Sequence, residues 1–264
     1  MTSESAVPTE SAGLPNGGRM PLLGFGTWQI KGADARRSVS DALEVGYRHL
    51  DTAKVYGNES EVGAALQASG VDRGEVFVTT KIPPNDVGRA DKTLAESLDK
   101  LGLTSLDLWL IHWPGGDGAD VDLWNAMVDA QKQGLVTDIG VSNYSLAQID
   151  ALREATGVTP AVNQIEWSPL LFDRAVLDGN RQQGVVLEGY SALRGGTLEH
   201  PVIGEIASAH GRTPAQVIIR WHIQHGVVVI PKSVKRERIA ANAAVGDFSL
   251  TDEEMAKIDA LGRS

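Results

Sequence analysis

Short apolar runs alternate with longer, helix-like segments along almost the entire chain, and this alternation restricts the fold more than any other feature of the sequence. Eight runs are short and almost continuously apolar, as in strands that are buried on both faces of a parallel sheet. They occupy residues 22–25, 47–51, 76–81, 106–112, 136–141, 161–166, 185–190 and 227–231. Helical patterns occupy residues 34–45, 59–69, 89–101, 121–133, 146–155, 174–183, 202–210, 214–225 and 236–244. Eight strands that are each followed by a helix predict a single (β/α)8 TIM barrel of the α/β class.

Both ends of the chain carry local signals of their own. Residues 14–20 combine Pro, Asn and Gly between short apolar pieces, which predicts a small hairpin that closes the bottom of the barrel. Thr213 and Thr251 begin helix-capping sequences, and the second opens a last helix near the end of the chain. Residues 1–9 contain no apolar run, and we expect a disordered leader there, which leaves residues 10–264 for the barrel domain.

The composition excludes several classes of protein. Apolar residues make up 42% of the 264 residues, which is enough for a buried core, and the formal net charge is −10. An acidic chain is poorly suited to general nucleic-acid binding. The chain has no cysteine, so disulfides, thiolate nucleophiles and cysteine-ligated metals are excluded. No stretch resembles a signal peptide or a membrane span, so we expect a cytoplasmic enzyme without a nucleic-acid or membrane partner.

Polar and aromatic residues follow the predicted strands, at the edge of a barrel where active sites are found. Asp51 ends the second strand, Tyr56 lies in the loop after it, and Lys81 and His112 end the next two strands. A tyrosine, with its usual pKa of about 10, becomes a better proton donor beside a cation such as Lys81. Asp51 can pair with Lys81, and His112 can hydrogen-bond the oxygen that Tyr56 protonates. Because this set supplies no reductant, the sequence predicts a bound hydride donor.

Each of these residues also has a purely structural interpretation. A lysine at a strand end is usually solvated, and a histidine in a strand is usually a core residue. The catalytic interpretation therefore depends on the four residues occurring together at successive strand ends. Core packing is expected for three tryptophans, Trp109, Trp124 and Trp221. His222 and His225 have a spacing that suits a metal on a helix face, but no third ligand is evident and no metal is expected.

The stretch from Gly46 to Gly63 resembles the signature of the aldo-keto reductase family, which reads Gly-aromatic-Arg-x-x-Asp-Thr-Ala through Glu-x-x-Val-Gly. Further motifs are Lys81, His-Trp-Pro at 112–114 and Ile-Pro-Lys-Ser at 230–233. The resemblance spans residues 14–261 and is strongest to the bacterial branch that includes the 2,5-diketo-D-gluconic acid reductases. It implies an oxidoreductase whose catalytic tetrad is Asp51, Tyr56, Lys81 and His112, with the tyrosine as general acid.

The same resemblance implies a site for NADPH. The family positions for the nicotinamide, pyrophosphate and ribose are matched by Ser142, Asn143, Gln164, Tyr190, Ser191 and Leu193. The positions for the adenosine 2′-phosphate and the adenine are matched by Lys232, Ser233, Val234, Arg238 and Asn242. Positive charge gathers in this second group although the chain is acidic, and arginine suits planar phosphate binding, which favours NADPH over NADH. We expect Lys235 and Arg236 to be solvated residues at the start of a helix rather than phosphate ligands. The site is not of the Rossmann type, because Gln29 occupies the place of the third glycine.

The substrate pocket implied by the resemblance has walls made by Trp28, Tyr56, His112 and Trp113. The family's loops over the barrel mouth are short here, at residues 115–120 and 191–196, and the usual C-terminal tail is almost absent. We therefore expect an open site that reduces several small aldehydes and ketones, with keto sugars or dicarbonyls among them. A monomer is expected.

Two other functions stay open on the sequence alone. The first is a nucleotide-binding redox sensor or binding module with little turnover, against which the complete set of four catalytic candidates argues. The second is a phosphate-binding barrel isomerase, which would leave Gln164 and Tyr190 without a role.

Overall fold

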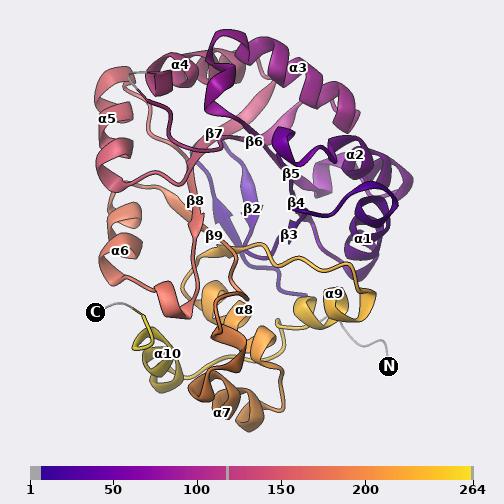
Figure 1. The fold of residues 1–264 in the computed structure, drawn as a ribbon, viewed down its shortest axis with the longest axis vertical. Coiled ribbons are helices and arrows are strands. Elements are labelled where there is room, and N and C mark those ends of the chain that lie inside the picture. The colour runs from indigo at the N-terminus through magenta and orange to yellow at the C-terminus, as the bar shows by residue number, and fades with distance from the viewer. Residues whose placement is uncertain (1–6, 117–118, 263–264) are drawn as a thin grey trace.

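The computed structural model of the chain describes residues 7–116 and 119–262, and eight parallel strands lie at its centre (Figure 1). The strands are β3 Phe25–Gly26, β4 His49–Asp51, β5 Phe77–Ile82, β6 Leu106–Ile111, β7 Val136–Ser142, β8 Val162–Glu166, β9 Val186–Tyr190 and β10 Val228–Val229. Each pairs in parallel with the next in chain order. The sheet closes because Leu23 bridges to Val229, and Gly24 N donates to Val229 O at 2.9 Å. The predicted (β/α)8 barrel is confirmed.

Helices form a ring around the strands (Figure 1). They are α1 Gly32–Val45, α2 Glu59–Ala68, α3 Ala90–Leu101, α4 Ala119–Lys132, α5 Leu146–Thr156, α6 Arg174–Gln182, α7 Pro201–His210, α8 Pro214–Gln224, α9 Arg236–Ala243 and α10 Asp252–Asp259. Five short 3₁₀ turns lie between them: η1 Lys54–Tyr56, η2 Arg73–Glu75, η3 Pro84–Arg89, η4 Pro169–Leu171 and η5 Thr197–Glu199. Capping boxes at Thr213 and Thr251 begin α8 and α10 as predicted. The described helices include none that is long and apolar enough to cross a membrane.

The predicted hairpin closes the N-terminal end of the barrel. It consists of β1 Ser11–Gly13 and β2 Arg19–Pro21, and β2 is seen inside the ring of strands in Figure 1. Asp138, a buried residue near the start of β7, accepts hydrogen bonds from Asn16 N at 3.0 Å and Gly18 N at 3.2 Å. These bonds fix the hairpin tip against the barrel, so that only the opposite end is left open for a site.

The structure differs from the sequence-based prediction mainly where the barrel closes. β3 and β10 are shorter than the predicted runs 22–25 and 227–231. Pro231, at the end of the second run, has no N–H to continue the ladder beyond β10. Gly26 approaches the facing strand so closely that a Cβ there would lie 2.7 Å from Ile230 O. Residues 1–6 of the expected leader lie outside the described residues.

Candidate active site

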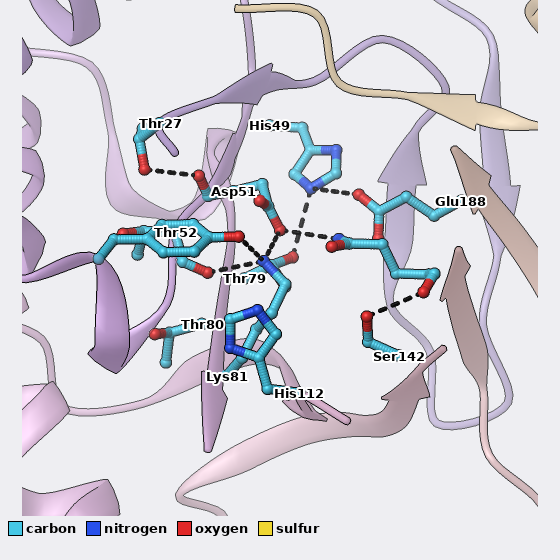
Figure 2. A network of polar contacts seen from close by, with 12 residues as sticks. Thr27, His49, Asp51, Thr52, Thr79, Thr80, Lys81, His112, Ser142 and Glu188 are labelled. Atoms are coloured by element: carbon cyan, nitrogen blue, oxygen red, sulfur yellow. Dashed lines mark hydrogen bonds and ion pairs between the residues drawn. The ribbon is translucent and has the colours of Figure 1, made fainter. Parts of the chain in front are cut away.

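A buried ion pair lies in the barrel at the C-terminal ends of the strands. Lys81 Nζ, from β5, donates to Asp51 Oδ2 of the neighbouring strand β4 at 2.6 Å, and also to Thr52 O at 2.9 Å (Figure 2). Gln164 of β8 donates to the same Asp51 oxygen at 2.9 Å. Burial alone would lower the pKa of Lys81, but the opposing effect of several groups, Asp51 foremost, raises it above its usual value. Lys81 is therefore a cation with fixed partners.

Tyr56 ends the turn η1 directly after β4, which brings its hydroxyl to this ion pair. Lys81 Nζ lies 3.4 Å from Tyr56 Oη and 5.1 Å from the centre of the ring. Burial raises the pKa of Tyr56 to about 12, and the charge of Lys81 opposes the rise. The lysine lowers the pKa as expected from the sequence, but the net shift is upward, because a phenolate loses more solvation here than one paired lysine restores. Tyr56 is consequently protonated at neutral pH.

His112 directly follows β6 and lies against Tyr56. The two rings meet edge to face, with centres 5.6 Å apart and planes at 73°. Burial, together with the nearby charge of Lys81, lowers the pKa of His112 to about 2. The imidazole is therefore neutral at neutral pH. Trp113 stacks on it with ring centres 3.7 Å apart.

The loop that carries Tyr56 is anchored on both sides. Asn58 donates to two backbone carbonyls of the β3–α1 loop, each at 2.9 Å, and accepts from Thr52 Oγ1 at 2.7 Å. Lys54, at the start of η1, pairs with Asp86 of η3. The sequence analysis did not single out Lys54, Asn58 or Asp86, because their role is to hold a turn that the periodicity of the sequence does not reveal.

A cavity of about 1050 Å³ opens above the ion pair. Most of the residues proposed from the sequence line it, namely Trp28, Asp51, Tyr56, His112, Trp113, Ser142, Asn143, Gln164, Tyr190, Ser191, Leu193, Lys232, Ser233, Arg238 and Asn242. Lys81 is fully buried and reaches the cavity only through its partners. Val234 is the one cofactor candidate that does not line the cavity, and its side chain is largely exposed.

One wall of the cavity is a connected set of amide and hydroxyl groups. Ser142 Oγ donates to Gln164 O at 2.8 Å, and Asn143 Nδ2 donates to His112 O at 3.1 Å. Tyr190 Oη donates to Asn143 Oδ1 at 2.8 Å, which fixes the Tyr190 ring beside the cavity. Asn143 has a positive φ of 65°, a backbone conformation that asparagine tolerates better than most residues. The wall is therefore assembled by local hydrogen bonds before any ligand arrives.

Three basic residues, Arg194, Lys232 and Arg238, line the cavity and make part of its wall positively charged. Burial and the neighbouring Arg194 lower the pKa of Lys232, and both cations lie over the ring of Trp28. Arg238 lines the cavity, whereas Arg236, on the same helix α9, is bound by Asp41 and Glu44 of α1. Arg236 is therefore held by two carboxylates rather than simply solvated, and Arg238 as an anion ligand stays a prediction.

Several lining residues were not foreseen. Gln29, Arg194 and the start of α8 at residues 213–215 border the cavity, as does Val55 beside Tyr56. Arg194 contacts Trp28, with its guanidinium carbon 4.9 Å from the ring centre. No sequence signal identifies these positions, because they come from loops that meet only when the barrel closes.

The histidine pair on α8 makes contacts within the protein. His222 has Ile218 O at 2.7 Å and Trp167 O at 3.3 Å from its two ring nitrogens, and His225 Nε2 lies 2.7 Å from Asp259 Oδ1. Within residues 7–116 and 119–262, no cluster of three potential metal ligands is found. The three tryptophans expected in the core, Trp109, Trp124 and Trp221, are fully buried.

Comparison with known proteins agrees with this geometry. Residues 22–263 match the Aldo/keto reductase family. An aldo-keto reductase of Mycolicibacterium vanbaalenii is 46% identical over 99% of this chain and 94% of its own length. The methylglyoxal reductase DkgA of Salmonella typhimurium is 45% identical over 94% of this chain and 92% of its own length. A solved protein described as a candidate 2,5-diketo-D-gluconic acid reductase B superposes with a TM-score of 0.91 at 39% identity, covering 96% of this chain and 92% of the other. The chain, with its closed barrel and its tyrosine, lysine, aspartate and histidine at the strand ends, belongs to the aldo/keto reductase family.

Proposed function

We propose that the protein reduces small aldehydes and ketones to alcohols with NADPH as hydride donor and Tyr56 as proton donor. The observation that carries this proposal is the contact of Tyr56 Oη with Lys81 Nζ at 3.4 Å, beside a cavity that the tyrosine itself lines. Asp51 holds the lysine in place at 2.6 Å. A protonated phenol beside a fixed cation is suited to releasing a proton to a nascent alkoxide.

The residues present fit a dinucleotide with an extra phosphate. The volume of about 1050 Å³ is at the upper end of the range for ligand pockets. Tyr190 offers a flat ring, Asn143 and Gln164 offer amides, and Lys232 and Arg238 offer positive charge. Burial, and then the charge of Arg194, lower the pKa of Lys232, and an anionic group beside these two cations would offset both effects.

When bound, the reduced nicotinamide supplies a hydride to the carbonyl carbon and is left oxidised. As the electron pair of the C=O bond moves to oxygen, Tyr56 transfers its hydroxyl proton to that oxygen, which yields the alcohol and a tyrosinate. Lys81 stabilises the tyrosinate, and Asp51 keeps Lys81 in position. Neutral His112 donates a hydrogen bond to the same oxygen. Solvent then returns a proton to Tyr56.

The substrate class follows from the walls of the cavity mouth. Trp28 and Trp113 are large, exposed apolar side chains that border the cavity together with Val55. Relatives named for methylglyoxal and for 2,5-diketo-D-gluconic acid support small dicarbonyls as the first compounds to test. We also propose that the enzyme is a cytoplasmic monomer, in line with its resemblance to the bacterial branch of the family.

Tyr56→Phe tests the proposal. We expect wild-type turnover of NADPH with methylglyoxal, and a loss of about 10²- to 10⁴-fold in kcat in the variant, the usual contribution of a general acid. The binding of NADPH, measured by fluorescence, should not change. Tyr47→Phe is a control for the loss of a buried phenol hydroxyl, because Tyr47 does not line the cavity and donates to the backbone atom Ile239 O at 3.2 Å. Full activity in Tyr56→Phe would refute the assignment, and tight binding without turnover on any carbonyl would favour the sensor function.

A further inference from the structure

A second carboxyl group, Glu188 of β9, is buried inside the barrel behind the ion pair of Asp51 and Lys81. Its side chain is fully buried, and it shares its sheet register with Gln164, which donates to Asp51 (Figure 2). Glu188 Oε1 lies 3.8 Å from His49 Nε2, and His49 belongs to β4, the strand that also carries Asp51. The reaction described above gives Glu188 no role.

The two carboxyl groups have opposite surroundings. Asp51 accepts hydrogen bonds from Lys81 at 2.6 Å and from Gln164 at 2.9 Å. Neither oxygen of Glu188 has a hydrogen-bond partner among the described residues. A carboxylate that is buried without donors is costly, whereas a neutral carboxylic acid is not. Geometry alone therefore separates the pair into a charged Asp51 and an uncharged Glu188.

The titratable groups that face Glu188 agree with this assignment. Burial, and then the charge of Asp51, raise the pKa of Glu188 to about 8, while the neighbouring Gln164 amide and then the charge of Lys81 oppose the rise. The Gln164 amide makes its hydrogen bond of normal geometry to Asp51 rather than to Glu188. Burial lowers the pKa of His49 to about 3, so this neighbour is neutral as well. On the outer face of β9, His222 packs against Gly189 and is bound to backbone carbonyls.

We propose that Glu188 is a positioning residue that controls proton transfer at Tyr56 through its own protonation state. This inference rests on the proposed function, in which Tyr56 exchanges a proton with the substrate. While Glu188 is neutral, Asp51 is the single negative charge that faces Lys81, and Lys81 is left to stabilise the tyrosinate. Once Glu188 loses its proton, a second negative charge competes for Lys81 and opposes formation of the tyrosinate. Ionised Glu188 should therefore slow the oxidation of the alcohol, because in that direction of the reaction the tyrosinate form of Tyr56 must act as a base.

The test compares alcohol oxidation with NADP⁺ between pH 7 and 10 in the wild type and in Glu188→Gln. The rate should rise with pH as the tyrosinate fraction grows. In the wild type the rise should flatten above a break near pH 8, because Glu188 ionises there. In Glu188→Gln the break should be absent, and kcat/KM at pH 9.5 should exceed that of the wild type by about tenfold, the size of a one-unit change in a pKa. Glu188→Met, which also lacks a charge, should behave in the same way.

Glu59→Gln is the matched control. Glu59 is likewise a buried carboxyl group, but it lies on α2 and accepts from Thr80 Oγ1 at 2.7 Å, so its variant should keep the break. Infrared spectra of the wild type provide a readout that needs no turnover: one neutral carboxyl band should disappear between pH 7 and 9.5. A wild type without this band, or a break that persists in Glu188→Gln, would overturn the proposal. A fully active Tyr56→Phe would refute the proposed role of Tyr56 and with it the control of that residue by Glu188. A break that persists in Glu188→Gln while Tyr56→Phe is inactive would refute the role of Glu188 and leave the proposed function intact.

Discussion

At the scale of single residues, two arginines on one helix allow the choice of cofactor to be tested. Arg238 lines the cavity, and within the described part of the chain its guanidinium makes no ion pair, whereas Arg236 is held by Asp41 and Glu44. We expect Arg238→Ala to weaken NADPH binding by about ten- to a hundredfold, since a charge-assisted hydrogen bond contributes about 1.5–3 kcal/mol. NADH, which lacks the 2′-phosphate, should bind almost as before. Fluorescence titration checks both, with Arg236→Ala as the control that should change neither, and an equal loss for the two cofactors would contradict the phosphate assignment.

Residues at strand ends were predictable, and residues that act through buried neighbours were not. Tyr56 and Lys81 were found because a barrel places strand ends at one mouth and because a phenol needs a cation. The sequence indicates that Lys81 lowers the pKa of Tyr56, but it does not show how completely the hydroxyl is buried, and burial outweighs the lysine. No role was predicted for Glu188, because its neighbours His49 and Asp51 come from β4, which is distant in sequence from β9.

At the scale of elements, the packing of α2 on α3 predicts opposite effects for two helical glycines. Gly63 of α2 lies so close to the end of α3 that a Cβ would be 2.4 Å from Leu101 O, a backbone atom that cannot move aside. Gly63→Ala should lower the free energy of unfolding by about 1–3 kcal/mol, the usual cost of overpacking. Gly204 of α7 has no atom within 4 Å of such a Cβ, so Gly204→Ala should instead stabilise the protein by up to about 1 kcal/mol. Urea unfolding measures both, and a neutral Gly63→Ala would show that α2 can shift away from α3.

Helices were easier to predict than the turns between them. The capping sequences at Thr213 and Thr251 operate within a few residues, so the sequence alone specifies where α8 and α10 begin. The turns η1 and η3 were not predicted, because they are held by contacts such as Lys54 with Asp86, which are distant in sequence. Since η1 carries Tyr56, the part of the site that was hardest to predict is the turn that sets the position of the proposed proton donor.

At the scale of the whole molecule, buried neutral histidines make the fold sensitive to acid. Burial lowers the pKa values of His49, His112 and His222 to about 3, 2 and 4, whereas in the unfolded chain they stay near 6.5. As the pH falls from 6.5 to 5, the unfolded state therefore gains protons at these histidines that the folded state does not, and the difference approaches three protons near pH 5. Glu188 acts in the opposite sense, because its pKa is raised to about 8 and the folded state already holds its proton.

The net difference grows to about two protons near pH 5, so the free energy of unfolding should fall with acidification by up to about 2–3 kcal/mol per pH unit at the acidic end of this window. Glu188→Gln removes the opposing proton, so its stability should fall more steeply, by up to about 4 kcal/mol per unit. Guanidinium unfolding curves at pH 6.5, 6.0, 5.5 and 5.0 for the two proteins give both slopes. Equal slopes would mean that Glu188 is ionised in the folded state, and a flat profile in the wild type would mean that the barrel admits protons to its buried histidines without unfolding.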